Sequence, residues 1–294
     1  ATFRAGVITA ILGNNGVGKS TLLKGILALT PCLGGSVRLD GTEVGSLPAA
    51  VRARKLAYLE QQASCHWPMS VARVVALGRA PHGEHRHSLL DHAPHGERDH
   101  FQRDGAPHLE NGSAPIDCAP QEAQDPVPLA RPSGAAETIQ RKSRQTAPDP
   151  VLTAMTITDT ARLADRPVTR LSGGERARVM LARALATDAP VLLADEPVAG
   201  LDPRHQLSVL EHLQQWAASG RIVIVTLHDL NLALRYCEDT LLLGTDSTAC
   251  FGRSADILTP DTIRGVFGVE VRAVTVDGRT TLVNWAIAPS ASGR

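Results

Sequence analysis

The segment Gly13-Asn-Asn-Gly-Val-Gly-Lys-Ser20 fills every fixed position of the pattern Gly-x4-Gly-Lys-Ser/Thr. Glycines at these positions let successive backbone N–H groups point at one anion, and the helix that follows adds its positive N-terminal end. Lys19 would contact the β- and γ-phosphates of a nucleoside triphosphate, and the Ser20 hydroxyl would bind Mg²⁺. The alternative, a plain glycine turn between a strand and a helix, is disfavoured because all four fixed positions are filled. The expected nucleotide-binding residues are Gly13, Asn14, Asn15, Gly16, Val17, Gly18, Lys19, Ser20 and Thr21.

Two adjacent carboxylates end an apolar run at Val191-Leu-Leu-Ala-Asp-Glu-Pro197. A buried strand rarely ends in adjacent acids unless they serve a cation or a reaction. We expect Asp195 to bind Mg²⁺ through water and Glu196 to polarise an attacking water. The alternative is a strand followed by a helix with an acidic first turn, and the phosphate-binding pattern makes that interpretation weaker.

A third pattern, Leu171-Ser-Gly-Gly-Glu175, precedes an amphipathic segment. Ser172 is a natural helix N-cap, and with Glu175 it forms a Ser-x-x-Glu capping box. Two glycines at a helix N-terminus also expose backbone N–H groups to a phosphate. The spacing alone leaves both interpretations open.

Strands and helices alternate around these patterns. Runs rich in β-branched residues predict buried strands, and apolar residues at helical spacing predict the helices between them. This alternation favours a mainly parallel sheet covered by helices on both faces. The expected strands are Val7–Leu12, Leu56–Leu59, Val191–Ala194 and Ile222–Leu227, and the expected helices are Lys19–Leu29, Val71–Leu77, Ser172–Ala186, Pro203–Ala218 and Asp229–Tyr236.

Composition narrows the class of protein. The 294 residues carry equal numbers of basic and acidic side chains, so a protein that holds nucleic acid by general charge attraction is not expected. No apolar run approaches the length of about 20 residues needed to span a bilayer. Five scattered cysteines without a Cys-x-x-Cys pair predict reduced thiols. Residues 83–148 lose apolar periodicity and are rich in proline and histidine, which predicts a solvated, disordered insertion rather than a metal site.

With these three patterns in this order, the chain resembles the nucleotide-binding subunit of an ATP-binding cassette (ABC) transporter. Leu171–Glu175 matches the family's signature, Gly13–Ser20 its Walker A motif and Val191–Pro197 its Walker B motif. The resemblance implies a P-loop NTPase (RecA-like) α/β fold, a mainly parallel sheet with an α-helical signature subdomain. It assigns catalytic roles to Glu196, His228 and Gln61, Mg²⁺ ligation to Ser20, Gln61 and Asp195, a D-loop role to Asp202, and contact with a partner's ATP to Leu171, Ser172, Gly173, Gly174 and Glu175.

The resemblance also implies a domain division and a set of partners. The expected parts are a nucleotide-binding core over 1–62 and 187–260, a helical signature subdomain over 63–186 that contains the insertion, and a C-terminal extension over 261–294. The cassette is expected to lack the family's N-terminal strand and its adenine-stacking aromatic residue. Expected partners are a second copy of the chain, transmembrane permease subunits and, indirectly, a substrate-binding protein, at the cytoplasmic face of the inner membrane.

Two functions from different classes follow. Trp67–Val71 and Val75–His82 are similar to importers of iron-siderophores, haem and cobalamin, which favours a Mg²⁺-dependent ATPase that drives such an importer. The alternative is a truncated or degenerate cassette that docks or regulates without turnover. The intact Glu196 and His228 favour the first hypothesis, and the missing N-terminal strand favours the second.

Overall fold

A computed structural model describes residues 1–32, 34–61, 68–83, 149–245 and 248–287. Contacts between residues group 1–91 with 148–294 as one unit, and a second unit, 92–147, lies wholly outside the described residues. The predicted insertion 83–148 therefore lies almost entirely outside them too. No helix within the described ranges is both long and apolar enough to cross a membrane.

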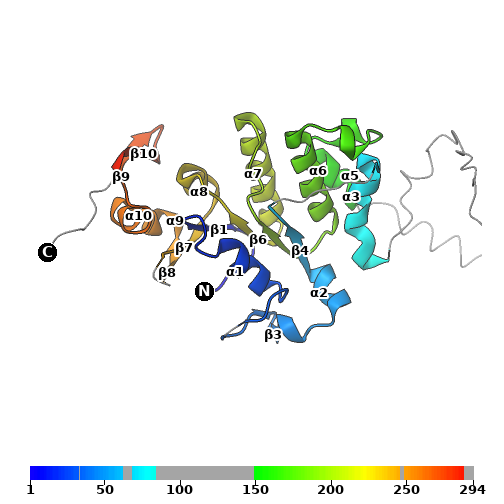
Figure 1. Cartoon of the computed structure of the whole chain (residues 1–294), viewed down its shortest axis with the longest axis horizontal. Coiled ribbons are helices and arrows are strands. Elements are labelled where there is room, and N and C mark those ends of the chain that lie inside the picture. The colour runs from blue at the N-terminus through cyan, green and yellow to red at the C-terminus, as the bar shows by residue number, and fades with distance from the viewer. Residues whose placement is uncertain (33, 62–67, 84–148, 246–247, 288–294) are drawn as a thin grey trace, which may run out of the picture. The chain divides into compact units, whose positions relative to one another are not determined.

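The elements alternate between strands and helices along the chain (Figure 1). The first half contains β1 (Ile8–Gly13), α1 (Lys19–Ile26), β2 (Arg38–Leu39), β3 (Thr42–Glu43), α2 (Ala49–Lys55), β4 (Leu56–Leu59), α3 (Val71–Ala76), α5 (Pro150–Ile157) and α6 (Gly173–Ala186). The second half contains β5 (Val191–Ala194), α7 (Pro203–Ala218), β6 (Ile222–Thr226), α8 (Leu230–Tyr236), β7 (Asp239–Leu243), β8 (Ala249–Arg253), α9 (Ser254–Ile257), α10 (Pro260–Phe267), β9 (Val269–Val276) and β10 (Arg279–Ile287). Short 3₁₀ turns lie at Val44–Ser46, Leu77–His82, Ala161–Leu163 and Val168–Arg170.

A six-stranded sheet in the order β4-β5-β6-β1-β7-β8 forms the centre of the described unit. Every neighbouring pair is parallel except β7 and β8, so the predicted mainly parallel sheet is confirmed. Since β1, β4, β5 and β6 run in the same direction, the loops that follow them meet at one edge of the sheet. These loops carry the P-loop, Gln61, the paired acids and His228.

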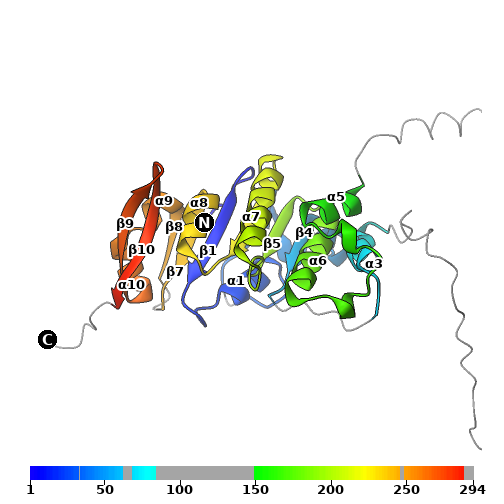
Figure 2. The same ribbon diagram turned by 90° about the horizontal axis from the view of Figure 1, so that it is seen from above.

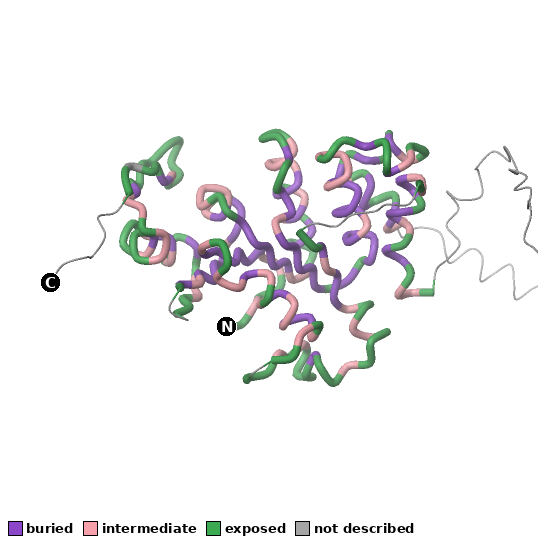
Figure 3. The backbone as a smooth tube through the Cα atoms, viewed as in Figure 1, coloured by how far each residue is buried: buried purple, intermediate pink, exposed green. Residues whose placement is uncertain are grey.

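Helices cover both faces of this sheet, as the alternation predicted (Figure 1). On one face, Leu23 and Ile26 of α1 and the following Leu27 pack against Ile11 and Ile224. The opposite face carries the larger apolar cluster, to which α6, α7 and α8 contribute. The strands are buried along the middle of the unit, while the helices are exposed on their outer sides (Figure 3). The sheet is therefore a rigid platform for the loops at its edge.

The helical part of the unit packs α3 and α5 against α6 (Figure 2). Ser70 caps α3 by accepting a hydrogen bond from Arg73 N, and Asp149 caps α5 by accepting from Val151 N. Helix α6 presents Val179, Met180 and other apolar side chains to the core. The signature pattern lies at the N-terminus of this helix, so the packing of α6 determines where the signature points.

The structure differs from the sequence prediction at the end of the first helix. Lys19–Leu29 was expected to be helical, but α1 ends at Ile26 and Ala28 has a positive φ of 51°. Leu29 is 59% exposed, so extending the helix would bury nothing at that position. The antiparallel strand β8, the hairpin β9–β10 and helix α10 were not predicted at all.

Candidate active site

The P-loop leaves the end of β1 through a close backbone approach. Gly13 has a φ of 150°, and a Cβ atom there would lie 2.6 Å from the carbonyl oxygen of Leu243. At the other end of the loop, Gly18 caps α1 in the left-handed region at φ 102° and has no side chain to accept from the helix. The first N–H groups of α1 therefore face the loop without a side-chain acceptor, which is the arrangement that binds phosphate.

Lys19 lies inside this loop. Its side chain is buried, and Nζ donates to the carbonyl oxygens of Gly13 at 2.8 Å and Asn14 at 3.2 Å. Desolvation lowers the pKa of Lys19, while the nearby carboxylates of Glu196 and Asp195 act against that shift. Lys19 therefore places a positive charge at the position where phosphate oxygens would enter.

The first acid of the pair is held by a residue that sequence reasoning missed. Asp195 is 3% exposed, and Thr226 Oγ1 donates to its Oδ1 at 2.7 Å. The same Thr226 oxygen accepts from the backbone N–H of Glu196 at 2.8 Å. One hydroxyl from β6 therefore fixes both acids at the end of β5. The available signal was a threonine in an otherwise aliphatic strand, two residues before His228.

Glu196 and His228 meet, although 31 residues separate them in the chain. Glu196 has a φ of 53°, a conformation that side-chain-bearing residues adopt rarely and that is concentrated at functional sites. His228 Nε2 donates to Glu196 Oε1. The Glu196 side chain is 13% exposed and that of His228 is 48% exposed, so the acid faces inward and the imidazole faces solvent. The structure brings together these two predicted residues.

Gln61 lines a cavity together with Asp195 and Glu196. The cavity is lined by Gln61, by the two acids, and by residues of α6 and the loop after Glu196, among them Gly173, Arg176 and Gly200. Gln61 itself is exposed. The loop after β4, the two acids and the start of the signature helix therefore surround one hollow.

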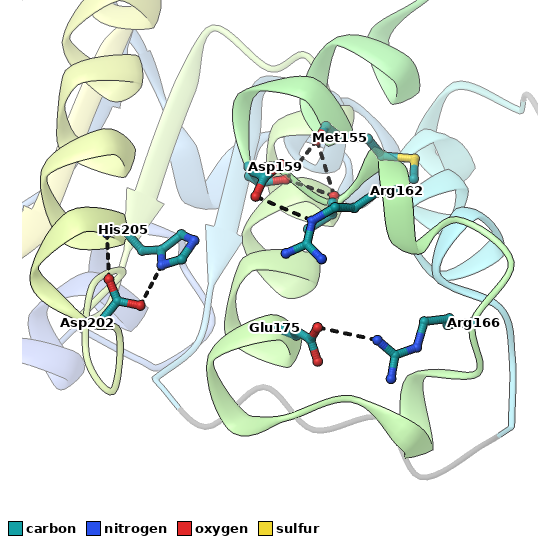
Figure 4. Close-up of polar contacts among 9 residues, drawn as sticks. Met155, Asp159, Arg162, Arg166, Glu175, Asp202 and His205 are labelled. Atoms are coloured by element: carbon teal, nitrogen blue, oxygen red, sulfur yellow. Dashed lines mark hydrogen bonds and ion pairs between the residues drawn. The ribbon is translucent and has the colours of Figure 1, made fainter.

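The signature residues form the capping box that their spacing predicted. Glu175 N donates to Ser172 Oγ at 3.2 Å, and Ser172 N donates to Glu175 Oε2 at 2.9 Å. Arg166 adds an ion pair to Glu175 at 3.4 Å (Figure 4). The backbone hydrogen bond from Ser172 is the main cause that lowers the pKa of Glu175. The capping interpretation is confirmed, and it leaves Ser172 and Gly173 exposed at the helix end.

Asp202 caps α7. It accepts from the backbone N–H of His205 at 3.1 Å, and its Oδ2 contacts His205 Nδ1 at 2.6 Å (Figure 4). The His205 contact is also the largest cause that lowers the pKa of Asp202. Within this chain the predicted D-loop aspartate therefore fixes the start of a helix, and the sequence did not predict His205 as its partner.

Tyr58 has a buried hydroxyl close enough to Asp195 to feel its charge. Tyr58 is on β4, opposite Leu193 of β5, and its hydroxyl is buried without a hydrogen-bond partner. Burial, with Asp195 and Glu60 as further causes, raises the pKa of Tyr58 to about 12. The side chain is therefore a neutral phenol near the Walker B aspartate.

The side chains at this edge of the sheet suit a nucleotide with Mg²⁺. Ser20, Gln61 and Asp195 offer hydroxyl, amide and carboxylate oxygens, the ligands that Mg²⁺ prefers. The N–H groups at the start of α1 and the Lys19 ammonium suit the phosphates that would share the ion.

Comparisons with known proteins agree with this geometry. The family model described as ABC transporter matches residues 1–199. A cobalamin import ATP-binding protein of Halobacterium salinarum is 34% identical over 284 residues, which are 96% of this chain and 57% of that protein. A hemin import ATP-binding protein of Pseudomonas entomophila is 35% identical over 273 residues, covering 91% of this chain and 84% of that protein. This chain therefore spans little more than half the length of the halobacterial relative.

Solved structures show the same fold. A dimeric bacterial ABC transporter cassette superposes with a TM-score of 0.58 at 23% identity and covers 86% of this chain and 88% of that one. A second structure is a dimeric cassette in a post-hydrolysis state with ADP and phosphate. It superposes with a TM-score of 0.56 at 22% identity, and the match covers 86% of this chain and 88% of that one. The predicted cassette fold is confirmed.

Proposed function

Because this chain belongs to the ABC transporter family, we propose that it is the ATP-binding and ATP-hydrolysing subunit of a membrane importer. The observation that carries the proposal is the contact between Glu196 and His228 beside a complete P-loop. A cassette without turnover has no need to keep a general base in a strained conformation next to its histidine partner.

The chain's own groups account for binding and for activation of water. Lys19 exchanges the carbonyl oxygens of Gly13 and Asn14 for phosphate oxygens, which form stronger charge-assisted hydrogen bonds. Glu196 accepts a hydrogen bond from the attacking water and directs it at the γ-phosphate. Mg²⁺, held by Ser20, Gln61 and Asp195, would neutralise charge that develops on the phosphate oxygens.

We assign His228 the role of holding Glu196 until nucleotide arrives. Its Nε2–H is donated to the carboxylate in this structure and is accessible from solvent. In the ATP-bound site the same N–H would donate to the γ-phosphate, which would free Glu196 for water. This exchange links the presence of a γ-phosphate to the availability of the base.

The signature points to a site shared between two copies of the chain. Ser172 and Gly173 are exposed at the start of α6, where the hydroxyl and the backbone N–H groups could meet the γ-phosphate bound by a partner's P-loop. We therefore propose a homodimer with two composite ATP sites, in which binding closes the dimer and hydrolysis releases it.

The names of the relatives suggest the cargo. Proteins 34–35% identical to this chain are named for import of cobalamin and hemin. We propose that this chain drives uptake of an iron-siderophore, haem or cobalamin, that it binds transmembrane permease subunits at the cytoplasmic face of the membrane, and that a substrate-binding protein delivers the cargo. The division into a core (1–62 and 187–260), a signature subdomain (63–186) and a C-terminal extension (261–294) belongs to this proposal.

The direct test compares the chain with Glu196→Gln. The amide keeps the size of the side chain but cannot polarise water, so ATP binding should persist while turnover falls at least about a hundredfold, the lower end of general-base effects. Turnover within twofold of the unchanged protein would remove Glu196 from the role of base. An unchanged chain that binds ATP without any hydrolysis would instead favour the docking or regulatory alternative.

The shared site has its own test. In a mixture of Ser172→Arg and Lys19→Ala chains, an antiparallel heterodimer has one composite site with both lesions and one site with neither. Part of the activity should therefore return, whereas a site completed within one chain could not recover because every chain is defective. A heterodimer of unchanged chain and double mutant is the control, since each of its sites carries one lesion.

A further inference from the structure

The C-terminal end of the described chain contacts the walls of the nucleotide site at two points. Helix α10 and the hairpin β9–β10, here called the C-terminal module, pack against α8 at one end of the sheet (Figures 1 and 2). Nothing in the motifs assigns this module a role. Two asparagines, Asn14 and Asn231, form hydrogen bonds between this module and the rest of the unit.

Asn14 joins the module to the P-loop. Its Nδ2 donates to the carbonyl oxygen of Val266 at 2.7 Å, across 252 positions of sequence. Val266 lies in the last turn of α10, where carbonyl groups have no partner within the helix, and Gly268 ends the helix in the left-handed region at φ 67°. The backbone carbonyl of the same Asn14 accepts from Lys19. A single P-loop residue therefore contacts both the phosphate-binding Lys19 and the end of α10.

Asn231 joins the module to the helix that follows the histidine. Asn231 Nδ2 donates to the carbonyl oxygen of Leu282 at 3.0 Å, and Leu282 N donates to Asn231 Oδ1 at 2.7 Å. The side-chain amide of Asn231 therefore bonds both backbone groups of Leu282, as a neighbouring strand would, and attaches β10 to α8. Asp229, the N-cap of α8, directly follows His228, so Asn231 lies only three residues after the histidine.

The module is a packed part of the unit. Ile263, Val271 and Leu282 are no more than 7% exposed and belong to the large apolar cluster that also contains Ala233 and Tyr236 of α8. A displacement of the P-loop or of α8 must therefore either carry the module along or break contacts with it. Packed interfaces of this kind transmit shifts because they deform poorly.

We infer that the C-terminal module is a coupling element that positions the P-loop and the helix after His228 relative to each other, with Asn14 and Asn231 as its positioning residues. The inference rests on the proposed ATP binding. Linkage makes the coupling reciprocal: if the module's attachment raises affinity for ATP, bound ATP stabilises the attachment by the same factor.

The experiment uses the full chain with substitutions at Asn231, which touches no expected nucleotide atom. Asn231→Leu removes both bonds to Leu282, and Asn231→Asp keeps the bond from Leu282 N but loses the donor. Arg264→Gln is the matched control, because it removes the ion pairs of Arg264 with Asp261 and Glu270, both within the module, and leaves the two asparagine links intact. For each chain we would measure ATP affinity with a fluorescent analogue, KM and kcat, and thermal stability.

A second readout is independent of turnover. Amide hydrogen exchange in Val266–Ile287 is compared with and without ATP in the Glu196→Gln background. Coupling predicts slower exchange in this segment when ATP is bound. It also predicts that Asn231→Leu weakens ATP affinity at least about fivefold, the lower end of ordinary coupling between two sites. Asn231→Asp should weaken it less, and Arg264→Gln should leave it unchanged.

Two results would overturn the inference. One is unchanged ATP affinity in both Asn231 variants, together with exchange in the module that does not respond to ATP. The other is an equal loss in Arg264→Gln, which would show a general packing effect. Failure of the unchanged chain to bind ATP at all would instead refute the proposed function, so the two failures are distinguishable.

Discussion

Replacing Thr226 by valine tests whether one hydroxyl holds the acidic end of the site together. Valine has nearly the same shape but neither donates to Asp195 nor accepts from the N–H of Glu196. A hydrogen bond to a charged acceptor contributes about 1.5–3 kcal/mol, and a buried N–H left unpaired costs about 1–3 kcal/mol. Because Glu196 N is only partly buried, the cost of leaving it unpaired is at the low end of that range. We therefore expect Thr226→Val to lower the free energy of unfolding by about 2–4 kcal/mol.

The assay is urea unfolding followed by fluorescence, paired with ATP turnover. Thr226→Ser is the matched control, because serine keeps both hydrogen bonds and loses one methyl group, worth about 1 kcal/mol. Turnover in Thr226→Val should fall much more than in Thr226→Ser, since Asp195 and Glu196 lose their common anchor. Equal destabilisation by valine and serine, or a valine variant within 0.5 kcal/mol of the unchanged chain (about the scatter of neutral substitutions), would refute the reasoning.

Three further predictions concern charged and hydroxyl side chains near the same edge of the sheet. Lys19→Met should weaken ATP binding at least about tenfold, because it removes the ammonium that faces the phosphates, and a titration with a fluorescent nucleotide measures this. Glu175→Gln keeps an acceptor for Ser172 N, so its stability difference from the unchanged chain isolates the charge. Because folding lowers the pKa of Glu175, the stability that its charge provides should be fully present above the unfolded pKa of about 4.3. That stability should be lost as the pH falls through the folded pKa, and urea midpoints at several pH values measure the loss. Tyr58→Phe removes a buried hydroxyl without a partner, so thermal unfolding should show unchanged or slightly raised stability, and a clear loss would mean that the hydroxyl has a partner in solution.

The parts of the site that depend on local spacing were predictable from sequence. Gly18 and Lys19 follow a strand at fixed positions, and the capping box of Ser172 needs only the residues of one helical turn. In each case the hydrogen bonds or phosphate contacts depend on residues within about five positions of one another, so the sequence alone is enough to predict them. The parallel sheet followed for the same reason, from the alternation of elements.

The parts that were missed depend on partners distant in the chain. Thr226 matters because β6 lies beside β5, and the bond from Asn14 to Val266 exists because α10 returns to the P-loop. No spacing rule contains either contact. The hairpin β9–β10 escaped prediction because the apolar alternation of β9 changes phase between Ala273 and Val274, and because much of both faces of the hairpin is exposed.

The contacts that Lys19, His228 and the P-loop backbone already make determine how much each can contribute to ATP binding. Lys19 gives up two carbonyl oxygens, and His228 gives up Glu196, before either can contact a phosphate. Each exchange contributes only the difference between the new contact and the old one. The N–H groups at the start of α1 lose much less, because Gly18 caps the helix without a side chain and so leaves them no side-chain acceptor to give up. The backbone of the P-loop should therefore supply the basal affinity for ATP, while the exchanges at Lys19 and His228 make the response depend on the γ-phosphate. On this reasoning Lys19→Met keeps weak binding of both ADP and ATP but loses most of the preference for ATP, and a variant that binds neither would place the basal affinity on Lys19 instead.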